Sequence, residues 1–325
     1  MYQLFTDFIN KHQHISIIQA ENPDGDSLGS ALALEEILGS HEVTLYCPVQ
    51  MPKYLHYLNA WSRVTSDFDY DADAYIIVDS AAEILLSKVY ANSAAKNRLE
   101  TKPVLVLDHH ETESDLHFDH VIIQEQLAST TELIYKIAKD QNLEINVEAA
   151  TYLLAGLLSD TLGLISDSTT SQEYRTVAEL LDYGIKIAEF EENRRDYMKK
   201  SPRILDFKAD LIKRVEYSLD GRLATVLISW EDIREFSDEY NPNVLILEEL
   251  RLVEGVEVAV AIKTYPDGKL TGKIRTSKPV AEQLAGYFGG GGHKFAAGFR
   301  VYESYDTIAP ELTKITRELL DNEAL

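Results

Sequence analysis

The sequence predicts an α/β protein in which a parallel, doubly wound sheet is followed by a smaller α/β domain. Three observations predict this fold class. Short apolar runs alternate with helical spacing through the first half of the chain. Several of those runs end in an aspartate, which is where open parallel sheets collect their functional side chains. The second half instead shows alternating strand patterns around a hairpin signature.

The first half begins with the apolar run at 15–18, which leads through Asn22-Pro23 into helical spacing from Ser27. Apolar runs of this length, bounded by turn residues, are typical of buried strands. Further strands are expected at 43–47, 75–78, 104–107 and 121–123. Helices are expected at 27–38, 82–95, 131–138 and 147–158. This alternation predicts parallel strands with helices on both faces of the sheet.

Residues 171–213 show a charged helical pattern, and Ser201-Pro202 is its clearest break signal. Tyr265 to Lys269 is expected to be a hairpin turn, because it contains Pro-Asp-Gly between two strand patterns. Strands are expected at 223–228, 256–263, 270–274 and 296–299, and helices at 280–288 and 307–320. We therefore expect a first domain at 1–190, a helical linker at 191–213 and a second domain at 214–325.

Composition excludes several classes of protein. The formal net charge of -23 opposes adhesion to long nucleic acid, which depends on many basic contacts with phosphates. It leaves room for a short phosphorylated ligand in a local positive pocket. No apolar stretch is long enough to cross a bilayer, and the start lacks a basic secretory region. A single cysteine, Cys47, fits a reducing compartment, so we expect a cytoplasmic protein.

Acidic and histidine side chains follow three of the expected strands. Asp24 and Asp26 follow the first, Asp79 follows the strand at 75–78, and Asp108-His109-His110 follows the strand at 104–107. Because carboxyl ends of parallel strands meet at one edge of a sheet, these groups are expected to converge. Converging carboxylates repel one another unless cations neutralise them. The pattern therefore predicts a site for divalent metal.

Two further features belong with this chemistry. Asp160 ends an apolar helix, where capping alone would explain it, but together with the other groups it suits manganese, iron or zinc. Gly289 to Gly292 followed by His293 lies inside the second domain between a helix and a strand. Glycine lets backbone N–H groups approach an anion closely, and Arg275 lies in a nearby basic stretch. We expect an anion site there.

These motifs resemble the DHH phosphoesterase family with its DHHA1 partner domain, and specifically its nanoRNase/pAp-phosphatase type. The resemblance spans nearly the whole chain and rests on Pro23 to Ser30, Val78-Asp79, Asp108 to His110, Ser159 to Thr161 and Gly289 to His293. It implies that the first domain is the DHH metal-binding domain and the second the DHHA1 substrate-binding domain. It also implies a homodimer.

The resemblance further implies two metal ions, usually manganese. Asp24 and Asp79 would hold the first ion, and Asp26, Asp79, His109 and Asp160 the second, with Asp79 bridging. His110 would contact the substrate phosphate, and Asp108 would orient the histidines or accept a proton. The far end of the substrate would be held by Gly290, Gly291, Gly292 and His293, helped by Arg275.

The chain departs from the family pattern at two places. Ala20 stands where relatives carry a histidine ligand of the first metal. Glu21 is adjacent and could supply an oxygen, whereas His14 lies at the far end of the same strand. Leu162 to Ile165 stands where relatives often carry aromatic and basic residues, so the substrate preference does not transfer directly.

We therefore expect a metal-dependent phosphohydrolase that cleaves short oligoribonucleotides or small nucleotides, namely nanoRNA, pAp or linear dinucleotides. A hydroxide activated by two Mn²⁺ ions would attack phosphorus. The expected partners include no long duplex nucleic acid and no membrane. Two alternatives stay open: a nucleotide-binding protein with a degraded metal site, motivated by Ala20, and an inorganic pyrophosphatase or polyphosphatase.

Overall fold

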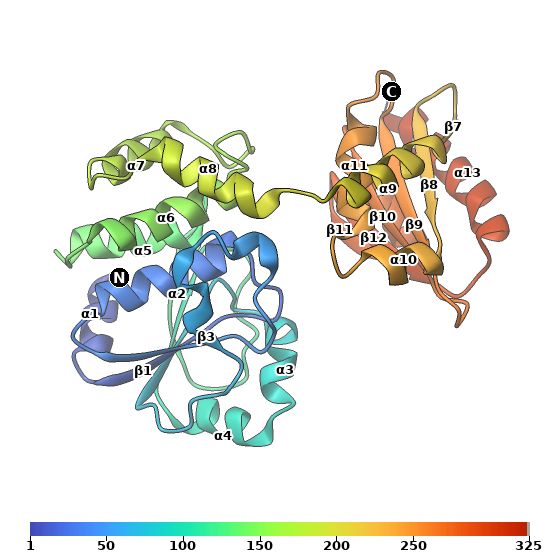
Figure 1. Cartoon of the computed structure of the whole chain (residues 1–325). Coiled ribbons are helices and arrows are strands. Elements are labelled where there is room, and N and C mark those ends of the chain that lie inside the picture. Colours follow the sequence, from blue (N-terminus) through green and yellow to red (C-terminus); the bar gives the residue numbers. More distant parts are fainter. Residues whose placement is uncertain (324–325) are drawn as a thin grey trace. The chain divides into compact units, whose positions relative to one another are not determined.

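The computed structural model describes residues 1–323 and contains two compact units, Met1–Lys199 and a second that begins at Lys200 (Figure 1). The first unit holds a six-stranded parallel sheet with the order β3-β2-β1-β4-β5-β6. Its strands are β1 (His14–Ile18), β2 (Glu42–Tyr46), β3 (Val64–Thr65), β4 (Ala74–Val78), β5 (Val104–Asp108) and β6 (Val121–Gln124). The order reverses between β1 and β4, which is the topological switch point of a doubly wound sheet.

Helices cover both faces of this sheet, as the alternation predicts. α2 (Gly25–Ile37), α5 (Thr130–Asp140) and α6 (Val147–Asp160) pack on one face together with α1 (Gln3–Ile9). α3 (Ser87–Tyr90) and α4 (Ser93–Thr101) pack on the other. In Figure 1, α7 (Ser171–Leu181) and α8 (Ile187–Met198) form an outer layer beyond α5 and α6. The central strands β4 and β5 are buried throughout, and β1 is buried except at His14, which explains the apolar runs in these strands.

The second unit holds a mixed six-stranded sheet with the order β11-β12-β10-β9-β8-β7. Its strands are β7 (Glu216–Ser218), β8 (Leu223–Ile228), β9 (Val258–Thr264), β10 (Leu270–Thr276), β11 (Gly291–His293) and β12 (Ala296–Val301). Only β8 and β9 pair in parallel. Its helices are α9 (Pro202–Lys213), α10 (Trp230–Phe236), α11 (Pro242–Arg251), α12 (Ala281–Tyr287) and α13 (Tyr305–Glu323). α9 and α11 cover one face, and α12 and α13 cover the other.

Two signals from the sequence have clear local explanations. Ser201 caps α9 by accepting the Ile204 N–H, and Pro202 occupies the first helical position, where its missing N–H costs nothing. The hairpin between β9 and β10 closes with the Tyr265 N–H donating to the Lys269 carbonyl, while Gly268 has a φ of 78°. Both elements follow from local chemistry, and the sequence predicts both.

Other elements differ from expectation. The single helix expected at 82–95 is divided into a 3₁₀ turn (Glu83–Leu86), α3 and α4, because the Asn92 side chain accepts the Ala94 and Ala95 N–H groups and starts a new helix. Residues 191–213 do not form a separate linker. α8 lies in the first unit, and α9 buries Ile204, Phe207 and Leu211 in the core of the second. The α1, α10 and α11 helices were not expected.

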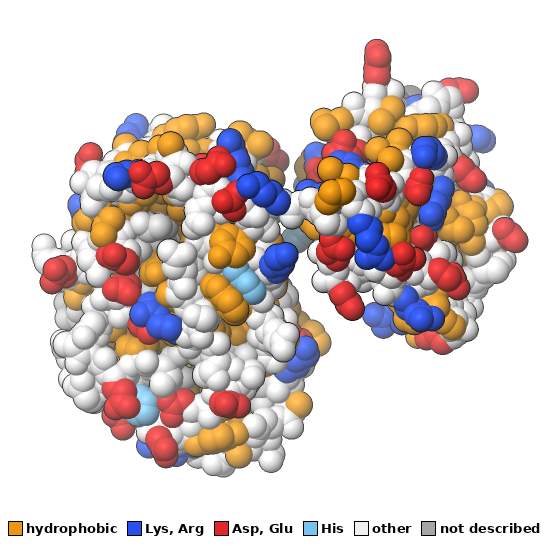
Figure 2. Space-filling model, viewed as in Figure 1, with side chains coloured by type: hydrophobic (Ala, Val, Ile, Leu, Met, Phe, Trp, Pro, Cys, Tyr) orange, Lys and Arg blue, Asp and Glu red, His pale blue; other side chains and the backbone are white. Residues whose placement is uncertain are grey.

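The charge is spread over both units. In the view of Figure 2, lysine and arginine side chains lie among aspartate and glutamate on each unit, so the side seen there is not a continuous acidic face. None of the helices within residues 1–323 is long and apolar enough to cross a membrane.

Candidate metal and catalytic site

The carboxyl ends of β1, β4 and β5 carry most of the polar groups that the sequence predicts to converge. Asp24 is the N-cap of α2, and its Oδ1 accepts the backbone N–H groups of Asp26 and Ser27, each at 3.0 Å. In turn, the Ser27 hydroxyl accepts the Asp24 N–H at 3.0 Å, which completes a capping box. This arrangement fixes the start of α2 next to the switch point and leaves Asp24 Oδ2 available.

Asp26 is fully buried and is held by the start of another helix. Its Oδ2 accepts the Thr130 N–H at 2.6 Å, and its Oδ1 accepts the Thr131 N–H at 2.9 Å and the Thr131 hydroxyl at 2.7 Å. The N-terminus of α5 therefore stabilises the ionised carboxylate, since the helix dipole and the free N–H groups both favour negative charge. One lone pair remains on Oδ2 for a further partner.

Asp79 follows β4 in the left-handed conformation, with a φ of 60° that costs energy for any residue other than glycine. Its side chain is only 8% exposed, and its Oδ1 accepts the Thr130 hydroxyl at 3.1 Å. Burial raises the pKa of Asp79 well above its ordinary value, and the charges of Asp26, Asp24 and Asp160 raise it further. A buried carboxylate in a strained backbone needs a compensating positive charge.

His109 faces two carboxylates with one ring nitrogen. Its Nδ1 lies 3.0 Å from the Leu127 carbonyl, so Nδ1 donates to that carbonyl and Nε2 is turned inward. Nε2 lies 3.3 Å from Asp160 Oδ2 and 3.5 Å from Asp79 Oδ1, yet it is buried and makes no hydrogen bond among the described residues. Burial alone would lower the pKa of His109, but Asp160 and Asp26 together raise it to about 9.

Asp160 ends α6 and completes this group. Burial raises the pKa of Asp160 to about 6, and the charges of Asp26 and Asp24 add to the rise against the opposing attraction of His109. Ligand atoms of Asp26, His109 and Asp160 lie within 4.8 Å of one another, as do those of Asp79, His109 and His110. We call Asp24, Asp26, Asp79, His109 and Asp160 the acidic cluster.

The acidic cluster fits a divalent cation on its own geometry. His109 has the arrangement that metal-binding histidines share, with one nitrogen fixed by a backbone carbonyl and the other buried without a partner. Carboxylate oxygens and one imidazole nitrogen form a donor set that suits manganese, iron or zinc. A cation there would also remove the repulsion that raises the pKa of Asp79.

Asp108 and His110 form a second pair beside the cluster. His110 Nδ1 donates to Asp108 Oδ1 at 2.7 Å, and the His110 N–H points to the same oxygen at 3.3 Å. Asp108 is 1% exposed; burial would raise its pKa, but the hydrogen bond from His110 outweighs this and lowers it. The His110 side chain is 54% exposed, so its Nε2 is accessible to a ligand.

Ala20 offers no ligand at the end of β1. It is 5% exposed, and its carbonyl accepts the Cys47 thiol at 3.5 Å. Glu21 turns elsewhere, because its Oε1 accepts the Ser87 hydroxyl at 2.9 Å. His14 is ion-paired to Asp69 at 2.8 Å, at the opposite end of the strand. Neither Glu21 nor His14 belongs to the residue groups that could hold a metal ion among the described residues.

The glycine segment lies at the edge of the second sheet. Gly291 to His293 form β11, which pairs with β12 and is exposed. A Cβ on Gly290 would lie 2.2 Å from the Gly298 carbonyl oxygen, and one on Gly292 would lie 2.6 Å from Ala297 Cα. Close packing on β12 therefore requires glycine at these two positions, a reason for glycine that is independent of anion binding.

Arg275 and His293 lie in one row across this sheet. Arg275 on β10 pairs with Ala296 on β12, and Ala296 pairs with His293 on β11. Directly paired residues of antiparallel strands project to the same face, so two basic side chains flank a small one. Lys273 lies on the same face beside Gly298, where a Cβ would meet Lys273 Nζ at 3.2 Å. Arg275 Nε lies 3.7 Å from Glu248.

Sequence reasoning missed the residues that orient the cluster. Thr130 and Thr131 donate to Asp26 and Asp79, and the Leu127 carbonyl fixes His109. Ser129 to Glu132 has the spacing of a capping box, which is a visible signal for the start of α5. That α5 begins against Asp26, more than one hundred residues away in sequence, is a property of the fold alone.

Residues 14–157 match the model of the DHH family, N-terminal domain. A relative from Thermus thermophilus, named "Bifunctional oligoribonuclease and PAP phosphatase NrnA", is 28% identical over 85% of this chain and 81% of its own length. A solved structure of an exopolyphosphatase-related protein from Bacteroides fragilis has a TM-score of 0.83 at 20% identity, and the match covers 99% of this chain and 95% of that one. The likeness to this structure shows the fold.

Another relative matches only about half of the chain. A protein of Streptococcus equi subsp. equi named "Probable manganese-dependent inorganic pyrophosphatase" is 26% identical over 52% of this chain and 56% of its own length. Residues 14–157, which lie in the first unit, therefore resemble the N-terminal domain of the DHH family, and the similarity to the Thermus thermophilus relative extends beyond these residues, over 85% of the chain.

Proposed function

We propose that this chain, a phosphoesterase with a DHH-family domain, hydrolyses short oligoribonucleotides and small phosphorylated nucleotides such as pAp. One observation carries the proposal: His109 Nε2 is buried without a hydrogen-bond partner between Asp79 and Asp160. The name of the Thermus thermophilus relative supports the substrate class, because its similarity covers 85% of this chain.

The acidic cluster would hold divalent cations, and we propose two Mn²⁺ ions. Asp79, His109, Asp160 and the remaining lone pair of Asp26 would hold one ion. Asp24 with Asp79 would hold the other, although Asp24 lies outside the two groups of close ligand atoms among the described residues. Bound there, the cations would supply positive charge to the phosphoryl oxygens and lower the pKa of water. Ala20 leaves the second of these sets with fewer protein ligands.

Besides the groups that would hold cations, His110 would act directly on the substrate phosphate, and Asp108 would orient the His110 ring. Asp108 accepts the His110 Nδ1–H and holds the ring in one orientation. His110 Nε2 is then free to donate to a phosphoryl oxygen of the substrate when the ring is protonated. The developing negative charge on the phosphoryl group would strengthen that hydrogen bond in the transition state.

The second unit would bind the end of the substrate that is remote from the reacting phosphate. Arg275, Lys273 and His293 present cationic or polar groups on one sheet face above the small residues Ala296 and Gly298. Such a surface suits a terminal phosphate, because the small side chains let an anion approach the backbone while the basic groups neutralise it. The homodimer stays a prediction.

Inorganic pyrophosphate is the alternative substrate. The acidic cluster of the first unit would suit the phosphate of pyrophosphate as well as that of a nucleotide. The relative named as a pyrophosphatase matches only about half of this chain, however. The basic face of the second unit lies outside the residues that the DHH model matches, 14–157. A substrate with a second end to hold explains that face better than pyrophosphate does.

The test is a panel of three substrates incubated with the purified full-length protein and Mn²⁺. We expect release of AMP from 5′-phosphorylated diadenylate and of phosphate from pAp, separated by chromatography. Phosphate release from pyrophosphate alone would refute the proposed substrate class. Binding of diadenylate without turnover in any divalent cation would favour the degraded metal site instead.

A further inference from the structure

A cavity in the first unit is lined by residues that directly flank members of the acidic cluster in the sequence. It has a volume of about 330 Å³ and is lined by Gly25 and Ser159. Gly25 stands between Asp24 and Asp26 in the sequence, and Ser159 directly precedes Asp160. A ligand that occupies this cavity therefore contacts residues that directly flank Asp24, Asp26 and Asp160 in the sequence. The volume is at the small end of the roughly 300–1,000 Å³ of ordinary ligand pockets, which suits a single nucleoside.

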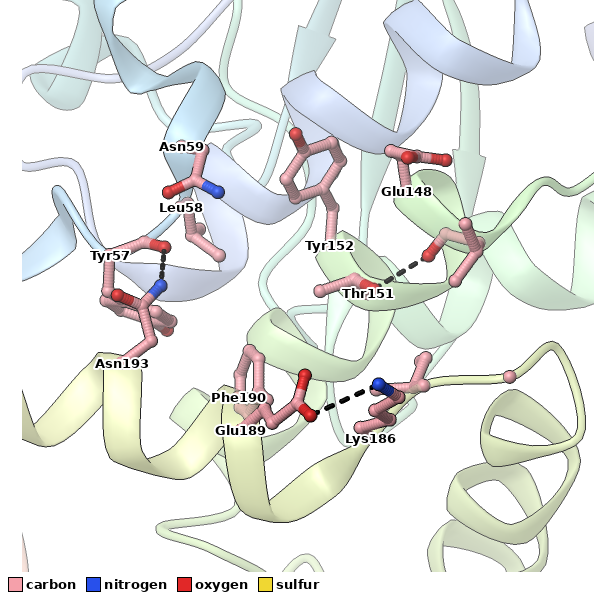
Figure 3. A pocket seen from close by; sticks show the side chains of 13 residues that line it. Tyr57, Leu58, Asn59, Glu148, Thr151, Tyr152, Lys186, Glu189, Phe190 and Asn193 are labelled. Atoms are coloured by element: carbon pink, nitrogen blue, oxygen red, sulfur yellow. Dashed lines mark hydrogen bonds and ion pairs between the residues drawn. The ribbon is translucent and has the colours of Figure 1, made fainter.

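Flat aromatic and apolar groups form most of the walls of this cavity. The principal ones are Tyr54, Leu55, Tyr57, Leu158, Leu162 and Phe190. The rings of Tyr57 and Phe190 meet edge to face, with centroids 5.7 Å apart. These two residues also line a larger pocket of about 520 Å³, which Figure 3 shows with Asn59 and Asn193 beside them. The two cavities therefore share Tyr57 and Phe190 as lining residues.

Arg194 adds a planar cation to the same cavity. Its guanidinium is held by Glu191, with Nη2 donating to Oε2 at 2.7 Å and Nε donating at 3.1 Å. A guanidinium fixed in this way keeps its flat face open. Aromatic rings and arginine planes are the groups on which proteins stack exposed nucleobases.

The loop after Asp160 holds a leucine in a costly arrangement at this cavity. Leu162 has a φ of 52°, and its side chain is 69% exposed. Leu164 also has a positive φ, of 70°. The loop is fixed by the Gly163 N–H donating to the Leu158 carbonyl at 2.8 Å and the Leu164 N–H donating to the Thr161 hydroxyl at 3.1 Å. Strained conformations of this kind cluster at ligand-binding sites, so Leu162 is a candidate for contact with a ligand in this cavity.

We propose that this cavity binds the nucleobase of the nucleotide nearest to the reacting phosphate. This inference rests on the proposed function, since it names where the base of that substrate lies. Tyr54 would be the main stacking partner, because it lines the cavity, is 48% exposed, and donates its hydroxyl to the Pro23 carbonyl at 3.2 Å. Leu162 covers the base from the side of the Asp160 loop. A phosphate without a base would make none of these contacts.

The experiment compares 5′-phosphorylated diadenylate with the same molecule lacking one adenine, at either position, in the presence of Mn²⁺. Tyr54→Ala is expected to lower kcat/KM for diadenylate roughly tenfold or more, which is the effect of losing one stacking contact. One of the two abasic substrates lacks the adenine that would stack on Tyr54. For that substrate, Tyr54→Ala is expected to leave kcat/KM unchanged. Tyr54→Phe keeps the ring and should retain most of the activity.

Tyr70→Ala is the matched control, because Tyr70 is a tyrosine of similar exposure, 41%, that precedes β4 at the opposite end of the sheet. Tyr70→Ala should not alter the ratio of kcat/KM for diadenylate to kcat/KM for either abasic substrate. Leu162→Gly removes an apolar contact and also relieves the positive φ. We expect it to lower kcat/KM for diadenylate while the melting temperature stays the same or rises.

The possible failures are distinguishable. If wild-type protein releases no AMP from diadenylate, the proposed function is wrong and this inference falls with it. If wild-type protein releases AMP but Tyr54→Ala impairs natural and abasic substrates equally, the function stands and the cavity does not hold the base. If Tyr54→Ala instead changes the sedimentation of the protein, a second copy of the chain occupies the cavity and the inference is overturned.

Discussion

The two units place charged groups near a sheet in opposite ways. In the first unit, the carboxylates of Asp26 and Asp79 are buried, and backbone or hydroxyl donors of α5 hold them. In the second unit, Arg275 and His293 lie on a partly or fully exposed face, and the glycine segment forms an exposed edge strand. The first region buries several negative charges next to the left-handed backbone of Asp79, whereas the second exposes positive charges that lose little hydration.

This difference indicates a division of work. Buried carboxylates of like charge raise each other's pKa and destabilise the protein until a cation or a proton neutralises them. Such a site is organised for chemistry. Exposed basic groups above glycine and alanine contribute little to folding and are suited to holding an anion. The following changes test this contrast in order of expected effect.

Asp79→Asn is expected to cause the largest change. Asparagine keeps the shape and accepts the left-handed backbone, but it removes a buried charge that the cluster needs to hold a cation. Hydrolysis should fall on the order of a thousandfold. In EDTA, however, the melting temperature should rise, because a repulsive charge is gone. A variant that is both fully active and less stable would contradict this assignment for Asp79.

Gly156→Ala tests how tightly the first site is packed. A Cβ at Gly156 would lie 2.7 Å from Asp26 Oδ1 and 2.4 Å from Thr131 Cγ2. We expect a loss of about 1–3 kcal/mol in the free energy of unfolding, together with a lower kcat. Denaturant unfolding and initial rates measure the two effects.

Gly286→Ala is the matched control for this change, because Gly286 lies in α12 with nothing within 4 Å of an added Cβ. Alanine is the better helix former, so this variant should be equally stable or up to about 1 kcal/mol more stable. Equal behaviour of the two variants would show that the Asp26 environment tolerates expansion.

Arg275→Ala tests the second unit. We expect KM for diadenylate to rise roughly tenfold while kcat changes little, since a charge-assisted contact remote from the reacting phosphate is lost. Arg317→Ala on α13 is the control, as it removes an exposed arginine on a helix that packs against the other face of that sheet. A fall in kcat without a change in KM would assign Arg275 to the reacting centre instead.

The smallest effect concerns stability against pH. Burial would raise the pKa of Asp232, but the hydrogen bond from Arg214 at 2.6 Å outweighs this and lowers it. A lowered folded-state pKa stabilises the protein above the ordinary pKa of about 3.9, and the contribution is lost as pH falls through the folded value. Asp232→Asn should therefore cost up to about 1 kcal/mol at pH 7 and progressively less below pH 4. A constant difference from pH 7 to pH 3 would contradict it.

Much of the fold follows from local signals. Each of the five longer strands of the first sheet contains the short, mainly apolar segment that predicts it, and the start of α9 is marked by Ser201-Pro202. The helices α10 and α11 were missed because each is short, with 7 and 10 residues, and has too few turns for a clear helical period. The break between α3 and α4 depends on one capping asparagine, Asn92, inside an otherwise helical pattern.

The sequence predicts which residue types form the site, but it does not predict the hydrogen-bonding groups that orient them. Asp24, Asp79 and Asp108 could be placed at one end of the sheet, because each follows a strand. The donors that orient Asp26 and His109 could not be placed, since they come from Thr130, Thr131 and Leu127, which lie close only in the folded chain. The strain at Asp79 is equally invisible in the sequence.

The most direct test of the account is the dependence of diadenylate hydrolysis on divalent cations. The wild-type protein would be stripped with EDTA, assayed for AMP release, and then titrated with Mn²⁺. We predict no activity after stripping and full recovery on addition of Mn²⁺, because the acidic cluster acts only when its charge is neutralised. Undiminished AMP release in EDTA would contradict the central claim that this cluster is a cation-dependent phosphoesterase centre.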